Sequence, residues 1–163
     1  MGHMGEGKNV ELVIEAFIEL YKRGFKAQIT FYGGSEERLA ELQNQYDLPP
    51  TIHFKGIVDE VPYHLHQCYL SASYTELFAN ACVEALNQGL LALLSDVEIA
   101  HRFYTNQSDA INLFKTKSEL IQMIEEMEQA DYSQSNAENI ALASHYSLGT
   151  VTQGYRELLD RNL

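Results

Sequence analysis

The residues that offer the most chemistry are two carboxylates, Glu76 and Glu84, on either side of an expected helix start at Asn80. The free backbone N–H groups and the positive dipole end of that helix would bind an anion such as phosphate. The small side chains of Ala79 and Ala81 would allow a close approach. Carboxylate oxygens accept hydrogen bonds from hydroxyl groups such as those of ribose and hexose. A diphosphate between two sugars is the outline of a nucleotide-sugar, and this segment is therefore our candidate binding site for one.

Strands and helices are expected to alternate along the chain, with short connections between them. Short apolar and β-rich segments predict five strands, over residues 27–32, 51–55, 69–73, 90–95 and 111–114. Helices are expected over residues 10–23, 35–46, 59–67, 80–88, 117–129, 134–146 and 148–161. This alternation predicts an α/β fold, a doubly wound, Rossmann-like parallel sheet with helices on both faces.

Ligands of doubly wound sheets bind outside the carboxyl ends of the strands, where the strand order reverses. The candidate site is therefore confined to the loops that follow the expected strands, over residues 33–35, 56–59, 74–80, 96–101 and 115–118. Glu76 lies in one of these loops, and Glu84 lies about one turn inside the helix after it.

Composition excludes several classes of function. The 163 residues include 11 Lys and Arg against 23 Asp and Glu, which gives a net charge of −12. Such a charge argues against nonspecific nucleic-acid binding and against a polybasic membrane-surface patch. The longest unbroken apolar run, Leu90 to Leu94, is far below the roughly 20 residues that a transmembrane helix needs. We therefore expect no nucleic-acid partner and no transmembrane segment.

The chain is expected to be a cytoplasmic protein with one domain. Its two cysteines, Cys68 and Cys82, cannot form a disulfide framework, and the N-terminus does not resemble a secretory signal. Residues 1–4, Met-Gly-His-Met, resemble the remnant of an expression tag. Residues 5–163 are expected to form a single nucleotide-sugar-binding domain, because their length fits one compact core.

The spacing His64-x-His66-x-Cys68 invites a metal interpretation. On the helix expected here, His64 and Cys68 would share a face while His66 would point away. A fourth ligand is not evident, so we expect no metal site.

Five motifs in order resemble the C-terminal domain of retaining GT-B fold glycosyltransferases, the glycosyltransferase group 1 family. The resemblance extends over most of the chain. Lys8 to Phe17 (KNVELVIEAF) resembles the family's helix motif K-G-x-x-x-L-I-E-A-F, and Ile29 to Gly34 resembles its second strand and glycine loop. His53 to Val58 resembles the element F-x-G-x-V, and Glu76 to Glu84 fits the signature E-x₇-E. Tyr146 to Leu148 resembles the F-S-W step.

The resemblance implies a role for each matching residue. Glu76 would be the catalytic residue, accepting hydrogen bonds from the hydroxyls of the transferred sugar, and Glu84 would hold the ribose hydroxyls. Lys8 would contact the diphosphate. The residues after Gly56 would border the base, and the backbone of residues 78–80 would cradle phosphate. The implied donor-binding residues are Lys8, Gly33, Gly34, Ile57, Val58, Phe78, Ala79, Asn80 and Glu84.

The resemblance also implies an activity. Members of the family transfer a hexose from a nucleotide-sugar, a UDP-sugar foremost, to a glycan, lipid or protein acceptor with retention, as in polysaccharide biosynthesis. The acceptor binds to an N-terminal domain of the same protein, so this domain alone is expected to be inactive. Neither a metal nor another cofactor is implied.

Several residues depart from the family pattern. Ala79 stands where a glycine is usual, Leu91 replaces a proline, and Glu98-Ile99 replaces a Gly-Gly pair beside the expected diphosphate. These departures favour an alternative, a non-catalytic GT-B-like partner or chaperone subunit of an active glycosyltransferase. A second alternative is a sugar-nucleotide 2-epimerase, which shares the fold.

The resemblance further implies that the first strand of the fold is missing. In the family, a central strand bearing a phosphate-binding arginine precedes the residue that matches Lys8, and the residues before Lys8 here cannot supply it. Its absence would leave two sheet edges unpaired. We expect these edges either to pair with another chain or to close up directly on one another.

Overall fold

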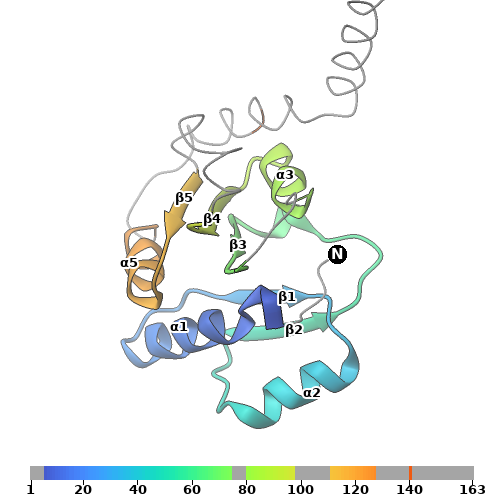
Figure 1. The fold of residues 1–163 in the computed structure, drawn as a ribbon, viewed down its shortest axis with the longest axis vertical. Helices are drawn as coiled ribbons and strands as arrows, with labels where there is room; N and C mark the ends of the chain where they lie inside the picture. The colour runs from blue at the N-terminus through green and yellow to red at the C-terminus, as the bar shows by residue number, and fades with distance from the viewer. Residues whose placement is uncertain (1–5, 75–79, 98–110, 128–139, 141–163) are drawn as a thin grey trace, which may run out of the picture.

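The computed structural model describes residues 6–74, 80–97, 111–127 and 140 (Figure 1). Its helices are α1 (Val10–Lys22), α2 (Glu36–Gln45), α3 (Asn80–Asn87) and α5 (Lys117–Met127), with short 3₁₀ helices η1 (Glu6–Lys8) and η2 (Tyr63–Leu65). The strands are β1 (Ile29–Tyr32), β2 (Ile52–Gly56), β3 (Cys68–Ser71), β4 (Leu91–Ser95) and β5 (Ile111–Phe114). All five predicted strands are confirmed. The helices expected over 134–146 and 148–161 lie outside the described residues, except for residue 140, which is helical.

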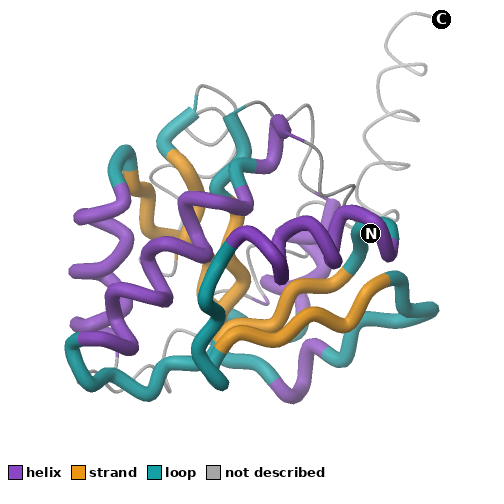
Figure 2. Tube along the Cα trace, turned by 90° about the horizontal axis from the view of Figure 1, so that it is seen from below, coloured by secondary structure: helices purple, strands orange, loops and turns teal. Residues whose placement is uncertain are grey.

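All the strand pairs that the structure describes are parallel, as expected for a Rossmann-like fold. The strands form a sheet of order β3-β4-β5 and a separate pair, β1-β2. Figures 1 and 2 show β1 and β2 side by side, apart from the other three strands. Leu91 to Leu94 of β4 are buried, because this strand has neighbours on both edges and is apolar on both faces.

Of the two outcomes expected for the unpaired sheet edges, direct closure of two strands on one another is wrong, and pairing with another chain stays a prediction. β1 and β3 are not hydrogen-bonded neighbours, and each has one edge without a strand beside it in the part of the chain that the structure describes. All four residues of each strand are only half-buried.

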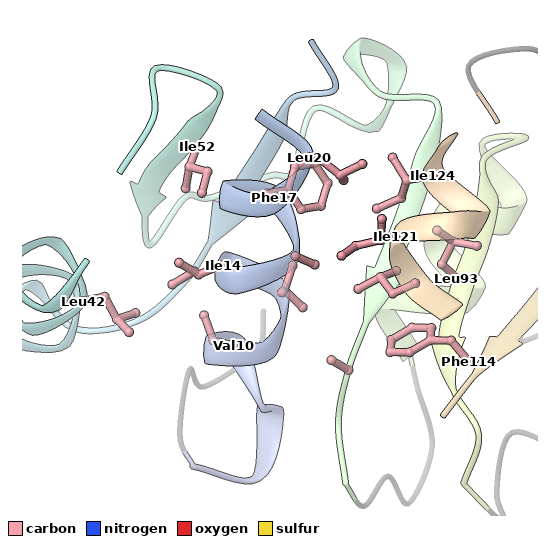
Figure 3. Close-up of a cluster of buried hydrophobic side chains, with 14 residues drawn as sticks. Val10, Ile14, Phe17, Leu20, Leu42, Ile52, Leu93, Phe114, Ile121 and Ile124 are labelled. Carbon is pink, nitrogen blue, oxygen red and sulfur yellow. The ribbon is translucent and has the colours of Figure 1, made fainter. Parts of the chain in front are cut away.

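One hydrophobic cluster joins the two groups of strands through α1. On α1, Ile14 faces Leu42 and Ile52, whereas Phe17 and Leu20 face α5 (Figure 3). The apolar residues recur at three- and four-residue spacing, so α1 buries a continuous stripe. Helix α1 is therefore the element that connects the β1-β2 pair to the sheet around β4.

Glycines end two of the helices, as the sequence predicts for Gly24 and Gly89. Gly24 has φ 92° and Gly89 has φ 82°, a region that favours glycine. After α3, the N–H of Leu90 donates to the C=O of Ala85 at 3.1 Å, and the N–H of Gly89 donates to the C=O of Leu86 at 2.9 Å. This Schellman motif fixes the turn from α3 into β4.

The prediction of a helix over residues 59–67 is wrong. Only the single 3₁₀ turn η2 forms there, directly after Pro62. Proline lacks an N–H and disfavours helical backbone at the residue before it, here Val61. The segment is therefore an irregular connection between β2 and β3 that carries one short turn.

Both cysteines are free thiols, as expected from their number. Cys82 is fully buried on α3, and burial raises the pKa of the Cys68 thiol to about 12.

Candidate functional site

The loops after β1 and β2 meet at the carboxyl edge of that strand pair. The N–H of Gly33 donates to the C=O of Gly56, so the two loops are hydrogen-bonded to each other. Gly33, Gly34 and Gly56 all have positive φ (102°, 82° and 64°), which a residue with a side chain adopts only with strain. The structure thereby places the predicted residues Gly33 and Gly34 beside the loop that holds Ile57 and Val58.

Ile57 and Val58 follow Gly56 at this edge and differ in exposure. The side chain of Ile57 is 73% exposed, whereas that of Val58 is half-buried. A large apolar side chain held in solvent next to polar loops is available for contact with a flat ring of a ligand.

Lys8 lies beside the end of β3. It is the last residue of η1, and the C=O of the preceding Gly7 accepts a hydrogen bond of 2.9 Å from the N–H of Tyr74. Tyr74 is the last described residue before the loop that holds Glu76. The backbone therefore positions Lys8 near Tyr74, which precedes Glu76 by two residues in the sequence.

Asn9 sets the direction in which the chain leaves Lys8. It precedes α1 with φ 49° and ψ 45°, a left-handed conformation that asparagine tolerates better than most residues. The motif of the family that the sequence resembles has glycine at this position. The left-handed backbone explains why glycine and asparagine both fit there.

We expect Asn9→Ala to lower the free energy of unfolding by about 1 kcal/mol, because the left-handed conformation is strained for alanine. Asn9→Gly should leave it within about 0.5 kcal/mol, because glycine adopts this conformation freely. Urea unfolding followed by circular dichroism measures both. Equal losses for the two variants would show that the side chain of Asn9, rather than its backbone conformation, matters.

Glu84 is exposed on α3, and one carboxylate oxygen is held by a tyrosine. The hydroxyl of Tyr63 donates to Oε2 of Glu84 at 2.9 Å and lies 3.5 Å from the C=O of Ala81. Burial and the hydrogen bond to Glu84 raise the pKa of Tyr63, so the phenol stays protonated and acts as the donor. Tyr63 could not be predicted as part of the site, because it lies 21 positions from Glu84 and shares no periodic pattern with it.

The remaining predicted residues divide between described and undescribed parts of the chain. Asn80 is exposed and is the first residue of α3, which agrees with the helix start expected there. Glu76, Phe78 and Ala79 lie outside the described residues, and so does the departure Glu98-Ile99.

A polar network links the carboxyl ends of β3, β4 and β5. Ser73 is buried, its hydroxyl lies 3.1 Å from that of Ser71, and its C=O accepts a hydrogen bond from the hydroxyl of Ser95 at 2.5 Å. Asp96 follows β4 and forms an ion pair of 3.1 Å with Lys115, which follows β5. The loops expected after these strands thus meet, and the carboxylate of Asp96 is paired with a cation.

The residues of the spacing His64-x-His66-x-Cys68 do not converge. Nε2 of His66 is hydrogen-bonded to the hydroxyl of Tyr32 at 2.8 Å, and the two rings are in edge contact. Among the residues that the structure describes, no group of three or more His, Cys, Asp or Glu side chains could hold a metal ion. The contact instead joins the end of β1 to the connection before β3.

Burial, with a smaller effect from His64, lowers the pKa of His66. A histidine with a lowered folded-state pKa binds fewer protons than in the unfolded chain, so its effect destabilises the fold as the pH falls below about 6.5. We expect the free energy of unfolding to decline between pH 7.5 and 5.5, and His66→Gln to make this decline shallower. Urea unfolding at several pH values measures it. An identical decline in the variant would assign the acid sensitivity to other groups.

The structure describes three parts of the candidate site at the carboxyl ends of the strands. The loops after β1 and β2 are hydrogen-bonded together, Lys8 lies by the end of β3, and Glu84 contacts Tyr63 in the connection from β2. A family model described as glycosyl transferases group 1 matches residues 1–141. The chain belongs to this family. Its parallel strands and helices are the Rossmann-like half of a GT-B fold.

Solved structures of glycosyltransferases share the fold at low sequence identity. The GtfA/B complex has a TM-score of 0.83 at 16% identity, over 98% of this chain and 34% of that one. Anabaena Alr3699/HepE in complex with UDP has a TM-score of 0.82 at 19% identity, over 99% of this chain and 47% of that one. The pneumococcal O-GlcNAc transferase GtfA in complex with UDP and GlcNAc has a TM-score of 0.77 at 17% identity, over 98% of this chain and 34% of that one. The chain thus spans between a third and a half of the length of these proteins.

A comparison with curated protein sequences finds no match. Within the described ranges, the helices are too short or too polar to cross a membrane.

Proposed function

We propose that the chain is the donor-binding domain of a glycosyltransferase that transfers a hexose from a nucleotide-sugar, foremost a UDP-sugar, with retention. The observation that carries this proposal is the exposed carboxylate of Glu84, held by Tyr63 in the connection that follows the β2 loop. Membership of the family supports the transferase activity. The complexes of Alr3699/HepE with UDP-glucose and of pneumococcal GtfA with UDP and GlcNAc support the choice of donor.

Each part of the site has a role in this proposal. Glu84 accepts hydrogen bonds from the two ribose hydroxyls, for which an ionised carboxylate is suited because it is only an acceptor. Ile57 and Val58 border the base, and the exposed side chain of Ile57 covers one of its faces. Lys8 binds the diphosphate, whose charge it offsets.

The other proposed contacts come from the family resemblance. Gly33 and Gly34 allow the donor to approach the backbone, and the N-terminus of α3 at Asn80, with Phe78 and Ala79, binds phosphate. Glu76 is proposed as the catalytic residue that contacts the transferred sugar. Positive charge and helix N–H groups suffice for the diphosphate here, so we propose that donor binding needs no metal and persists in EDTA.

The whole protein is proposed to act in the cytoplasm, with residues 5–163 as one domain and an N-terminal domain of the same protein binding a glycan, lipid or protein acceptor. The domain by itself is then inactive in transfer, because one of the two substrates has no binding site.

Calorimetric titration of the full chain with UDP, GDP and ADP tests the proposal. We expect UDP to bind with a dissociation constant below about 1 mM, which corresponds to about 4 kcal/mol of binding free energy. GDP and ADP should bind more weakly. The absence of binding by all three would contradict the proposal and support the alternative of a non-catalytic partner subunit, which the Glu98-Ile99 departure favours because a carboxylate repels diphosphate. Conversion of a UDP-sugar without acceptor would instead support the epimerase.

A further inference from the structure

We infer that Tyr63 is a positioning residue, which holds the carboxylate of Glu84 in the orientation that accepts hydrogen bonds from the vicinal hydroxyls of a ribonucleotide. This inference rests on the proposed role of Glu84 in donor binding. Tyr63 lies outside the motifs that resemble the family, and its contacts with α3 relate it to the site.

The geometry gives the hydrogen bond one direction. An ionised carboxylate has no proton to donate, so the hydroxyl of Tyr63 is the donor in the 2.9 Å contact with Oε2 of Glu84. The same hydroxyl lies 3.5 Å from the C=O of Ala81, one turn before Glu84 on α3. The phenol hydroxyl therefore lies against α3 at two points, the carboxylate of Glu84 and the backbone carbonyl of Ala81. The longer distance, to Ala81, places the hydroxyl relative to the helix backbone.

An exposed glutamate needs such a partner to be ready for a ligand. Glu84 is exposed, and a free glutamate side chain samples several rotamers, whose loss opposes binding. The hydrogen bond from Tyr63 selects one of them before the ligand arrives. A carboxylate has about four lone-pair sites, so Oε2 can serve Tyr63 while Oε1 and the remaining lone pairs accept from two hydroxyls.

The position of Tyr63 in the chain links two parts of the site. It begins η2, five residues after Val58, and its side chain is half-buried. Burial and the contact with Glu84 raise its pKa, so it keeps its proton at neutral pH. The loop proposed to border the base and the carboxylate proposed to bind ribose are therefore connected by one short segment.

The test compares two ligands on the Tyr63→Phe variant of the full chain. Phenylalanine keeps the ring and removes only the hydroxyl. We expect the affinity for UDP to fall about three- to tenfold, as for the loss of one hydrogen bond. The affinity for 2′,3′-dideoxy-UDP, which has no ribose hydroxyls, should stay within about twofold, because Glu84 then has nothing to accept from. Isothermal titration calorimetry measures both.

Tyr46→Phe is the matched control. Tyr46 is also half-buried with a raised pKa, but it lies at the end of α2, at the amino side of β2 and away from the candidate edge. We expect no change in either affinity. In the double variant Tyr63→Phe/Glu84→Ala, the loss of UDP affinity should equal that of Glu84→Ala alone, because Tyr63 acts through Glu84.

The outcomes separate this inference from the proposed function. A loss of UDP affinity in Glu84→Ala but not in Tyr63→Phe would overturn the role of Tyr63 and leave the donor site standing. Equal weakening of UDP and dideoxy-UDP in Tyr63→Phe would mean a purely structural role and would also overturn the inference. If neither Glu84→Ala nor Tyr63→Phe changes UDP binding, or if UDP does not bind, both the inference and the proposed function are wrong.

Discussion

Ile14→Ala should lower the free energy of unfolding by about 2–5 kcal/mol, the range for a large aliphatic residue truncated in a core. Ile14 is fully buried in the middle of α1. It lies between Leu42 of α2 and Ile52 of β2, in the cluster that also contains the apolar face of α5 (Figure 3). The truncation removes three carbon atoms from the helix that joins the two groups of strands, and in the described part of the chain those groups have no strand pairing between them to compensate.

Urea unfolding followed by far-ultraviolet circular dichroism measures this loss. The control is Leu65→Ala, which removes the same number of carbon atoms from a side chain that is 69% exposed, and it should change the free energy by no more than about 0.5 kcal/mol. A loss below about 1 kcal/mol for Ile14→Ala would show that α1 does not connect the two groups of strands as the structure indicates.

Local patterns in the sequence predict most of the elements. The stripe of α1, the fully apolar β4 and the glycine-ended turns at Gly24 and Gly89 each follow from a signal within a few residues. The helix expected over 59–67 fails because Pro62 interrupts it. No local pattern predicts the division of the strands into two groups, because it depends on which distant edges meet.

The candidate site shows the same limit. Gly33, Gly34, Ile57 and Val58 could be predicted at one edge, because loops after parallel strands share it. Tyr63 could not, since a hydrogen bond between a 3₁₀ turn and a helix 21 residues away leaves no periodic trace. For the Glu76–Glu84 pair, the structure describes only the second member, which is exposed on α3.

Glu84→Ala should weaken the binding of UDP to the full chain about tenfold to hundredfold. The estimate corresponds to about 1.5–3 kcal/mol, the usual contribution of hydrogen bonds to a charged group. The substitution removes the proposed acceptor for both ribose hydroxyls and keeps α3 intact, because Glu84 is exposed and alanine favours a helix. Calorimetric titration measures the affinity, and unfolding in urea checks that the fold is retained.

Glu126→Ala is the control for the effect of charge. Glu126 is likewise exposed on a helix and accepts one side-chain hydrogen bond, 2.8 Å from Gln122, but it lies on α5, away from the candidate edge. Both variants reduce the net negative charge by one, so a general electrostatic effect on a diphosphate would improve binding in both. Only a direct contact with the nucleotide makes Glu84→Ala weaken binding while Glu126→Ala does not. An unchanged affinity in Glu84→Ala would remove this carboxylate from the site and, with it, the observation on which the proposed donor-binding function depends.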